Sequence, residues 1–546
     1  MLLEDLIGDI ALTGARAAQA SGALPAFELP VSAPVARSKN PEWGDFSTAL
    51  AMQLAGSAHM APLEIAQAIE AHLPADDLVG STSVTPPGFL NFTVAPRWLA
   101  GQVDRIAEAG TGYADLDSGA GRSAQVEYVS ANPTGPLTVG HGRGGVIGDT
   151  VANALEAAGF DVTREFYFNN AGSQMRRLGE SYRCRYLQAL GDDVDVPEDG
   201  YKGQYLVDMA ELLAAERGGE LRDQPWETFK DLAEAELTAG QRETLRRVAI
   251  EMDVYFNEHS LYDDGTVWQT VDDLRERGFA YDRDGAVWFK ATALGGAEDR
   301  VIVRSSGEPT YRLPDIAYHV NKLGRGFDLV IDVLGADHKD AFPDVRRGVE
   351  ALGLDPEPIK ILMNQFVTVK GARMSKRAGH FTTLDELLDE VPGDVVRFFL
   401  LMRAPESHLE FDLDLALEQS DKNPVYYVQY AHARVSSILR LARERGFTTD
   451  GADVTLLTHP SELALIRRLL ELSTVIDRVA EDLTPHTLTT YARDLASDFH
   501  AFYRDCRVLD EGEPELSRAR LRLVEASRIG LARALDLVGV SAPEEM

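Results

Sequence analysis

The sequence predicts an α/β domain built on a parallel sheet, with a small α+β domain before it and an all-helical domain after it. Three observations support this prediction. A strand, a glycine-rich loop, a helix and a second strand follow one another over residues 125–168, which is the βαβ pattern of a parallel sheet. Mixed helical and strand patterns fill residues 1–120, and only helical patterns follow residue 420. The 546 residues are enough for three such domains.

The composition narrows the class of protein. Apolar residues make up 45% of the chain and charged residues 26%, which excludes bulk disorder and a fibrous protein. No apolar run reaches the ~18–20 residues that a membrane span needs, and the acidic, amphipathic start of the chain is unlike an export signal. Cys184 and Cys506 are too few for a disulfide framework or a cysteine-rich zinc site. We therefore expect a cytoplasmic protein with no membrane partner and no resident metal.

The net charge of -33 first argues against a polyanionic partner, because like charges repel at long range. The charge is uneven, however. Residues 421–546 hold 16 basic and 20 acidic side chains, a net of -4, whereas the first 420 residues carry the remaining -29. Fifteen of those 16 basic residues are arginine, which suits phosphate contacts, although the whole chain also favours arginine over lysine. The nearly balanced last quarter leaves room for a nucleic-acid partner.

Residues 1–120 form the first predicted domain. Helical spacing of apolar residues predicts helices at 2–20, 47–54 and 61–72 and from Trp98 onward, and a proline-rich turn at 86–88 leads into a short strand that ends at 94. Residues 115–121 are rich in glycine, aspartate and serine and are typical of a linker.

Residues 121–420 form the second predicted domain, with strands at 125–129 and 162–168 around a helix at 144–158. Further strands of the same sheet are predicted at 301–304, 329–334 and 359–369, with a helix at 342–352. Residues 191–295, with two long helical patterns and a hairpin at 281–288, are expected to be an insertion between two halves of this domain. About five helices are predicted for the third domain, residues 421–546.

The strongest local motif is the loop SANPTGPLTVGHGRGG at 130–145, between a strand and a helix. Such a turn directs backbone N–H groups at an anion, and Gly140 permits close approach to a phosphate. His141 at the helix start can donate to a phosphoryl oxygen, while Gly144 and Gly145 would let a flat ring pack on the helix. Glycine-rich turns also serve packing alone, so this motif does not establish nucleotide binding by itself.

A second motif is the segment VKGARMSKRAG at 369–379, which crowds four basic residues into an acidic chain. Such a loop can grip phosphates and stabilise the charge that builds up when a triphosphate is attacked. Together the two motifs resemble those of a class I aminoacyl-tRNA synthetase, in which an HIGH motif and a KMSKS loop flank the ATP site of a Rossmann-like domain. Residues 138–141 would be the HIGH motif and residues 373–377 the KMSKS loop, with Thr138, Arg373 and Arg377 departing from the consensus.

The resemblance assigns roles to individual residues. It implies that His141, Lys376, Thr138 and Arg373 are catalytic and that Mg²⁺ accompanies the nucleotide. The residues that would contact ATP are Thr138, Gly140, His141, Gly144, Met374, Ser375 and Lys376.

Within that class the chain resembles the arginyl-tRNA synthetase family along most of its length. The stretches that carry the resemblance are 44–46, 88–92, 126–133, 253–256, 315–319, 335–338, 383–388, 427–434 and 499–509. The resemblance implies an arginyl-adenylate intermediate, transfer of arginine to tRNA(Arg), and release of AMP and pyrophosphate by a protein expected to be a monomer. Two alternatives stay open: a non-catalytic synthetase-like protein that binds RNA or regulates a partner, and a tRNA-independent nucleotidylyltransferase.

The expected pocket suits arginine chemically, because a guanidinium has five donors and no acceptor and needs carboxylate and phenol oxygens around it. By resemblance, Glu127, Asp315 and Tyr311 would bind the guanidinium, and Asn132 and His338 the α-amino and carboxylate end. Asp315 lies four residues after Tyr311, so one helical turn would place both on one face. Without the resemblance, Glu127 would be taken for a surface carboxylate at a strand end and Tyr311 for a core ring.

Weaker expectations concern the neighbouring strand and the tRNA. Tyr167, Asn169 and Asn170 follow the second strand and are either pocket residues or turn residues. Tyr491 and Arg507 in the helical tail are candidate contacts for tRNA bases. Asn91 and Phe92 in the first domain are candidates for the tRNA elbow.

Overall fold

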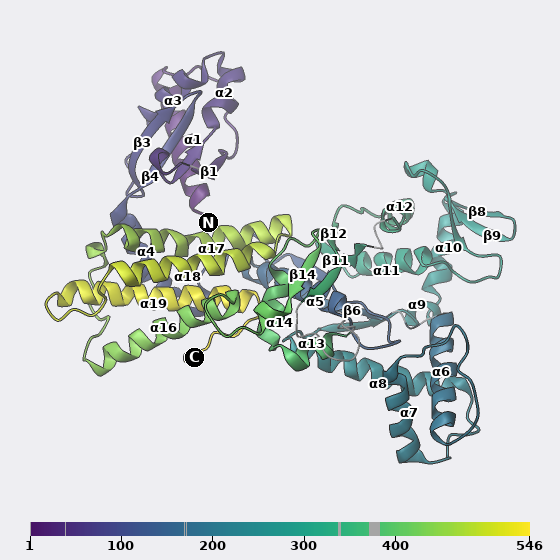
Figure 1. Ribbon diagram of the computed structural model, residues 1–546. Coiled ribbons are helices and arrows are strands. Elements are labelled where there is room, and N and C mark those ends of the chain that lie inside the picture. The colour runs from purple at the N-terminus through teal and green to yellow at the C-terminus, as the bar shows by residue number, and fades with distance from the viewer. Residues whose placement is uncertain (1, 39, 169, 171, 337–339, 371–382) are drawn as a thin grey trace.

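A computed structural model describes residues 2–38, 40–168, 170, 172–336, 340–370 and 383–546. Figure 1 shows a helical bundle at one end of the molecule, with the N-terminal domain standing off one side of the bundle and the parallel sheet in the middle, between the bundle and two arms. Two arms project from the sheet on opposite sides. In the described part of the chain, no helix is long and apolar enough to cross a membrane.

The N-terminal domain packs three helices on a four-stranded antiparallel sheet of order β1-β2-β4-β3. Its elements are α1 (Leu3–Ser21), β1 (Val35–Arg37), β2 (Phe46–Thr48), α2 (Leu50–Ala58), α3 (Pro62–Glu70), β3 (Val79–Thr85) and β4 (Phe89–Val94). The helix expected at 47–54 begins later, because the chain first pairs as β2 with β4. Strand β3 is rich in serine and threonine and mostly exposed, so the hydrophobic pattern does not predict it.

Helix α4 (Pro96–Ala109) lies among the C-terminal helices rather than with the N-terminal domain, although residues 1–120 were expected to form one unit (Figure 1). The Tyr113 hydroxyl donates to the Leu469 carbonyl at 2.5 Å, and Arg522 Nε donates to Asp104 Oδ1 at 2.9 Å. The bundle itself comprises α16 (Pro424–Glu444), α17 (Pro460–Asp482), α18 (His486–Asp505) and α19 (Pro514–Leu537). This is one α-helix fewer than the five expected, with a short 3₁₀ turn at Val454–Leu456 between α16 and α17.

The central sheet has five parallel strands in the order β12-β11-β5-β6-β7. They are β5 (Ser123–Glu127), β6 (Asp161–Phe168), β7 (Val254–Asn257), β11 (Leu329–Gly335) and β12 (Ile359–Asn364). Helix α5 (Val139–Ala157) connects β5 to β6 and is buried along most of its length. Helix α11 (Arg312–Gly324) precedes β11 in the sequence and α12 (Phe342–Ala351) follows it. The two helices pack against each other. The predicted parallel sheet is thus confirmed.

Three expectations about this sheet are wrong. Residues 191–295 are not one uninterrupted insertion, because β7 pairs in parallel with β6. The strand expected at 301–304 is β10 (Arg300–Val303), which pairs antiparallel with β9 (Ala286–Phe289) in a separate sheet with β8 (Ala280–Arg283). The strand expected at 359–369 divides at Gln365 into β12 and β13 (Val367–Lys370), and β13 pairs with β14 (Leu409–Asp412) instead.

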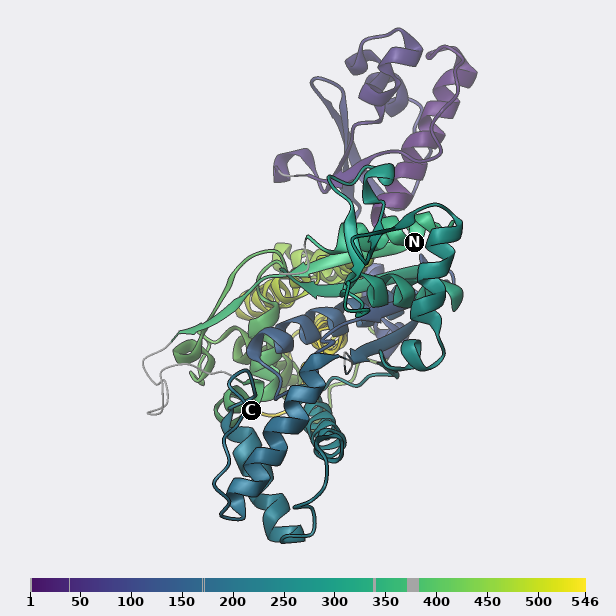
Figure 2. The same ribbon diagram turned by 90° about the vertical axis from the view of Figure 1, so that its right-hand side faces the viewer.

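The two arms are built from the segments between the strands (Figure 2). One arm contains α6 (Ser173–Ala189), α7 (Gln204–Arg217) and α8 (Trp226–Arg247) around a core that includes Tyr182 and Phe229. The other contains α10 (Thr266–Glu276) and the β8–β10 sheet around Phe289 and Leu274.

A buried arginine on α14 (Gly393–Leu401) joins the sheet domain to the end of the chain. Arg397 is 1% exposed; its guanidinium donates to the Val538 carbonyl at 2.9 Å, the Val248 carbonyl at 2.6 Å and Asp149 Oδ2 at 2.5 Å. Gly539 has φ +66°, and a Cβ there would overlap this guanidinium. One side chain therefore links α5, the end of α8 and the residues after α19.

Replacing Arg397 with leucine is expected to destabilise the protein strongly, because Asp149 would lose this buried cationic partner. Breaking a buried pair typically costs about 3–5 kcal/mol. Arg177→Leu is the matched control: its pair with Asp199 is exposed and typically contributes less than about 1 kcal/mol. Chemical denaturation should show a large loss in the free energy of unfolding for Arg397→Leu and a small loss for Arg177→Leu. Equal small losses for both variants would show that Arg397 does not hold the domains together.

Candidate active site

The glycine-rich loop ends in a reciprocal cap at the start of α5. Thr138 is the N-cap, and its Oγ1 accepts the His141 backbone N–H at 3.3 Å. In return, the Thr138 backbone N–H donates to His141 Nδ1 at 3.1 Å. Because Nδ1 is the acceptor, the neutral ring carries its proton on Nε2. The threonine that departs from the HIGH consensus thus fixes the orientation of the histidine.

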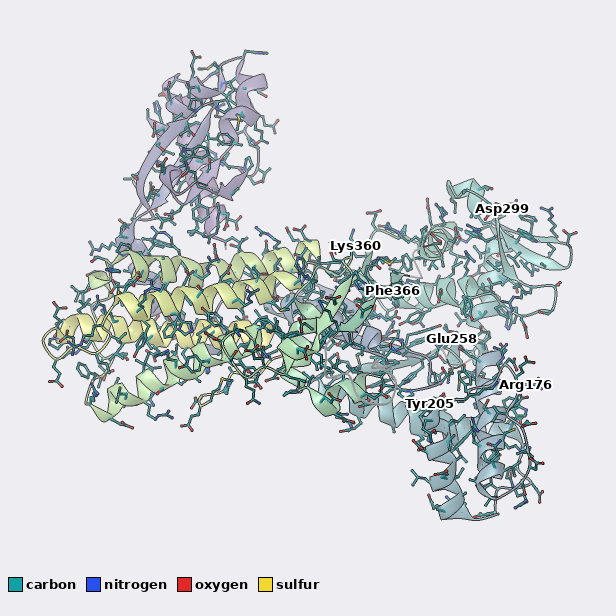
Figure 3. The ribbon with its side chains drawn as sticks, viewed as in Figure 1. Arg176, Tyr205, Glu258, Asp299, Lys360 and Phe366 are labelled. Atoms are coloured by element: carbon teal, nitrogen blue, oxygen red, sulfur yellow. The ribbon has the colours of Figure 1, made fainter. Side chains whose placement is uncertain are left out.

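The arm of α6–α8 holds the same loop in place. The Tyr205 hydroxyl on α7 donates to the Thr134 carbonyl at 2.5 Å. Gln241 Nε2 on α8 donates to the carbonyls of Asn132 at 3.1 Å and Gly135 at 2.9 Å. Figure 3 shows Tyr205 where this arm meets the sheet domain. The loop is therefore fixed by contacts from outside its own βαβ unit.

Arg373, Met374, Ser375 and Lys376 lie outside the described residues, as does His338. The chain on both sides of residues 371–382 is described and lies near the start of α5. Residues beyond the gap return to the glycine loop, because the Leu384 N–H at the start of α13 (Leu384–Glu390) donates to the Leu137 carbonyl at 2.7 Å.

Before the gap at 371–382, Arg143 of α5 binds the segment that leads into β13. It is fully buried and donates to the carbonyls of Gln365 at 3.0 Å, Ser407 at 2.8 Å and Ala404 at 2.9 Å. Burial lowers the pKa of this guanidinium to about 10. Because it holds the segments before β13 and β14, the described residues that precede the gap lie at one end of α5.

The glycines of α5 differ in their surroundings. A Cβ on Gly144 would lie 3.4 Å from Asn364 Nδ2, and that amide donates to the Gly140 carbonyl at 3.2 Å. Gly144 thus faces the carboxyl end of β12. A Cβ on Gly145 would lie 3.1 Å from Val129 and 3.2 Å from Ile250, so Gly145 packs on protein and not on a flat ligand as expected.

Buried charges meet where Glu127, the last residue of β5, pairs with Asp332 in the middle of β11. Lys322 of α11 donates to Glu127 Oε2 and to Asp332 Oδ1, and all three side chains are at most 7% exposed. Asp332 also contacts His319 Nε2 at 2.8 Å. Burial raises the pKa of Glu127 and Lys322 opposes this, while Lys322 and His319 hold the pKa of Asp332 well below its usual range. Glu127 is therefore a buried pocket group, and its interpretation as a surface carboxylate is wrong.

A second acidic group follows β7. Glu258 is 4% exposed, and its Oε2 accepts the Tyr167 hydroxyl at 2.6 Å. Burial, together with the nearby Asp315, raises the pKa of Glu258 to about 7. The pKa of Tyr167 is also raised, by burial and by the charges of Glu258, Asp315 and Glu127. Tyr167 thus lies among three carboxyl groups at the end of β6.

A bend after β5 connects Glu127 to this cluster. Val129 and Ser130 have φ +70° and +40°, a region that residues with a side chain rarely occupy. The bend lets Ser130 Oγ donate to Glu127 Oε1 at 2.8 Å and accept the Tyr167 backbone N–H at 3.2 Å. This hydrogen-bonded bridge ties the ends of β5 and β6 together.

The other expected arginine contacts lie near the same edge of the sheet. Tyr311 is 70% exposed, so its interpretation as a core ring is wrong, and its carbonyl accepts the Asp315 N–H at 3.3 Å, one helical turn away. Asn132 Nδ2 donates to Gln174 Oε1 at 3.0 Å. Three residues after the second strand were expected to be either pocket or turn residues. Tyr167 contacts Glu258, Asn170 contacts Glu234 of α8, and Asn169 lies outside the described residues.

Three residues expected to contact tRNA, Asn91, Phe92 and Tyr491, have buried side chains, so the expectation of a direct side-chain contact is wrong. Asn91 and Phe92 on β4 are each 1% exposed, and Asn91 Nδ2 donates to Thr85 Oγ1 at 3.1 Å. Tyr491 is 3% exposed, and its hydroxyl donates to the Leu469 carbonyl at 3.2 Å. Arg507 lies on the surface beside Asp510, at 3.3 Å.

Sequence reasoning missed Glu258 and Lys322. Glu258 lies two residues after the stretch 253–256, which the sequence pattern places inside an insertion, so the sequence does not show that Glu258 follows a strand. Lys322 falls on α11 at seven residues from Asp315, a spacing that puts both on one face. Across the described residues, no group of three histidine, cysteine or acidic side chains is arranged to hold a metal ion.

Comparison with known proteins assigns this geometry to a family. The model of the class I (R) tRNA synthetase catalytic domain matches residues 106–195 and 215–397. The arginyl-tRNA synthetase N-terminal domain matches residues 15–94, and the DALR anticodon-binding domain matches residues 428–546.

Whole-chain relatives agree. The arginine–tRNA ligase of Desulfotalea psychrophila is 46% identical over 512 residues, covering 92% of this chain and 93% of its own. That of Carboxydothermus hydrogenoformans is 43% identical over 556 residues and covers all of both chains. The solved structure of Thermus thermophilus arginyl-tRNA synthetase has the same fold, with a TM-score of 0.77, 24% identity and full coverage of both chains. The chain therefore belongs to the arginyl-tRNA synthetase family of class I synthetases.

Proposed function

We propose that this chain attaches L-arginine to tRNA(Arg) at the expense of ATP, through the pocket at the carboxyl edge of its parallel sheet. The observation that carries the proposal is the group of three carboxyl groups gathered around Tyr167: the buried Glu127 and Glu258 and the half-buried Asp315. The raised pKa of Glu258 means that its burial and the nearby Asp315 disfavour a negative charge there. A ligand that brings a positive charge would relieve that cost.

A guanidinium fits this requirement, because it supplies a permanent charge and several donors to carboxylate and phenol oxygens. In the proposed complex Asp315 and Glu258 face the guanidinium, with Tyr311 closing the exposed side. Glu127, already bonded to Lys322 and Ser130, supports the pocket from the sheet. Asn132, and His338 outside the described residues, would hold the α-amino and carboxylate end.

ATP would bind where α5 begins. The uncapped backbone N–H groups near Gly140, the oriented His141 and the basic segment that holds Arg373 and Lys376 would surround the phosphates, with Thr138 fixing the histidine. Gly144, Met374 and Ser375 would complete the nucleotide contacts. Mg²⁺ would enter with the triphosphate and be held largely by phosphate oxygens and water.

The reaction would follow two displacements. The arginine carboxylate attacks the α-phosphorus, pyrophosphate leaves and arginyl-adenylate forms. A terminal ribose hydroxyl of the tRNA then attacks the carbonyl carbon of the adenylate and AMP leaves. His141 and Lys376 would stabilise charge on the phosphorus, so the protein acts by positioning and electrostatics and forms no covalent bond itself.

The alternatives explain less of the structure. A tRNA-independent nucleotidylyltransferase needs neither the N-terminal domain nor the C-terminal bundle, and a regulatory protein needs no oriented His141 beside an acidic pocket. The expectation that the protein is a monomer stays a prediction. The cysteines Cys184 and Cys506 are both free, which fits the reducing cytoplasm we propose as its location.

The direct test is charging with a panel of labelled amino acids and total tRNA. We expect arginine alone to be attached, and only to tRNA(Arg), because lysine cannot offer the planar set of donors. Pyrophosphate exchange with and without tRNA would show whether activation needs the tRNA. Charging of lysine or glutamate would refute the proposed pocket.

Asp315→Asn is expected to raise the KM for arginine by about 10- to 100-fold, since a hydrogen bond between charged groups is worth about 1.5–3 kcal/mol. The KM for ATP should change far less, because the nucleotide is proposed to bind at α5. Asp272→Asn on α10 is the matched control, as its carboxylate lies at the surface beside Arg275. Equal loss of arginine and ATP use would indicate a structural role for Asp315.

Glu258→Gln is expected to stabilise the protein above neutral pH in the absence of arginine. The folded wild type must ionise a carboxyl group whose pKa is about 7 instead of 4.5, so it loses stability as the pH rises through that interval. The full effect is at most about 3 kcal/mol, at 1.36 kcal/mol per pH unit.

Thermal melting at pH 5 and pH 8 measures this difference, with Glu251→Gln at the surface as the control. The rise in melting temperature caused by Glu258→Gln should be large at pH 8 and small at pH 5. Added arginine should raise the melting temperature of the variant less than that of the wild type. A rise that is the same at both pH values would contradict the raised pKa of Glu258 as its cause.

A further inference from the structure

Asp344, in the first turn of α12, gathers three arginine side chains at one buried carboxylate. The residue is 3% exposed. Its Oδ2 accepts hydrogen bonds from Arg300 Nε at 3.1 Å and Arg312 Nε at 3.0 Å, and its Oδ1 accepts one from Arg347 Nη1 at 3.0 Å. A buried carboxylate needs charged donors of this kind, so the four side chains hold one another in place.

The three arginines come from different parts of the fold. Arg300 begins β10 in the arm that also carries β8 and β9, whereas Arg312 begins α11. Arg347 lies on α12 itself, and its Nε donates to the Leu294 carbonyl between β9 and β10 at 3.3 Å. In Figure 1, α11 and α12 lie between the central sheet and this arm. Asp344 therefore joins the arm to the first residue of α11.

The start of α11 carries two of the expected arginine contacts. Tyr311 directly precedes Arg312 and is the N-cap of the helix, and the N–H of Asp315 donates to the Tyr311 carbonyl at 3.3 Å. The preceding residue, Thr310, is bound to β10, because its N–H donates to the carbonyl of residue 302 at 2.8 Å. The backbone at Tyr311 is thus held by β10 before it and, through Arg312, by Asp344 after it.

A second contact fixes the first turn of α12 against α11. The Phe342 ring lies edge-on to the His319 ring, with 5.3 Å between the ring centres. His319 Nδ1 in turn contacts the Asp315 carbonyl at 2.7 Å. Phe342 and Asp344 belong to the same turn of α12, so this turn contacts α11 at its first residue and again next to Asp315. The position of Asp315 therefore depends on how the first turn of α12 is held.

We propose that Asp344 is a positioning residue for arginine binding. Through Arg312 it holds the first turn of α11 in the place where Tyr311 and Asp315 can meet the guanidinium. Displacement of a positioned group by about 1 Å can reduce activity by about 100-fold, so a contact outside the pocket can matter for the substrate inside it. The inference rests on the proposed function, since it takes arginine as the ligand of that pocket.

The test compares the two arginines of this cluster that are most alike. Arg312 and Arg347 have the same exposed fraction, 26%, and each lies 3.0 Å from an oxygen of Asp344. Only Arg312 belongs to α11, so Arg312→Leu is the test variant and Arg347→Leu is its matched control. In charging of tRNA(Arg), we expect Arg312→Leu to raise the KM for arginine about tenfold, the low end for a hydrogen bond between charged groups. Arg347→Leu should change it less than about twofold, as is usual for a partly exposed ion pair.

Two further variants test whether Asp344 acts through Arg312. Asp344→Asn keeps the shape of the side chain but loses its charge and one acceptor oxygen, so it should also raise the KM for arginine about tenfold. The double variant Asp344→Asn with Arg312→Leu should be no worse than either single variant, because both changes break the same contact. Arg312→Lys, which keeps the charge, should recover part of the loss. The KM for ATP should change less than about twofold in every variant, because the nucleotide is proposed to bind at α5.

Equal rises in the KM for arginine with Arg312→Leu and Arg347→Leu would overturn the inference. Additive effects in the double variant, or an equal rise in the KM for ATP, would overturn it as well. Should Asp344→Asn fail to fold, the comparison of Arg312→Leu with Arg347→Leu still decides the question. Failure of the wild type to charge arginine onto tRNA would refute the proposed function instead, so the two failures are distinguishable.

Discussion

Lys322 places one ammonium between two buried carboxylates, Glu127 and Asp332, and this contact fixes the centre of the sheet's carboxyl edge. A buried charge is tolerated only when it is paired and hydrogen-bonded, so the three groups must fold together. Beside this paired cluster, burial and the nearby Asp315 raise the pKa of Glu258 to about 7. A cationic ligand next to Glu258 would favour the ionised carboxylate, which is why the proposed arginine site lies there.

The second requirement is that the nucleotide site meets this pocket. Both depend on the strands β5 and β6 and on helix α5, since Glu127 ends one strand and His141 begins the helix that follows it. The bend at Val129 and Ser130 separates the two groups and is held by hydrogen bonds to Glu127 of β5 and Tyr167 of β6. Arg143 then ties the segments around the basic loop to the same helix. The strained backbone at Val129 and Ser130 is thus held by the hydrogen bonds of the Ser130 side chain.

Much of the fold could be predicted from the sequence, because the βαβ pattern and the change to purely helical spacing after residue 420 are local properties. Strand β7 could not, since its four residues depend on pairing with β6 and show no pattern of their own. That error hid Glu258, which follows β7 directly. Asn91, Phe92 and Tyr491 failed for a related reason: residue type suggested RNA contacts, whereas tertiary packing buries all three.

The net charge of the chain predicts the class of binding partner poorly, because recognition depends on which individual charges have no neighbouring charge of opposite sign. In a chain of -33, Lys230 and Arg246 of α8 each have a carboxylate partner at 2.7 Å, and such a pair presents little field to a ligand. The guanidinium of Arg242 on the same helix lies 3.8 Å from the centre of the Tyr255 ring, and a ring face binds a cation without cancelling its charge. Cations on one helix can therefore differ in the field that they present to a partner. The same reasoning, with the sign reversed, accounts for the pocket that Glu258 shares with Asp315.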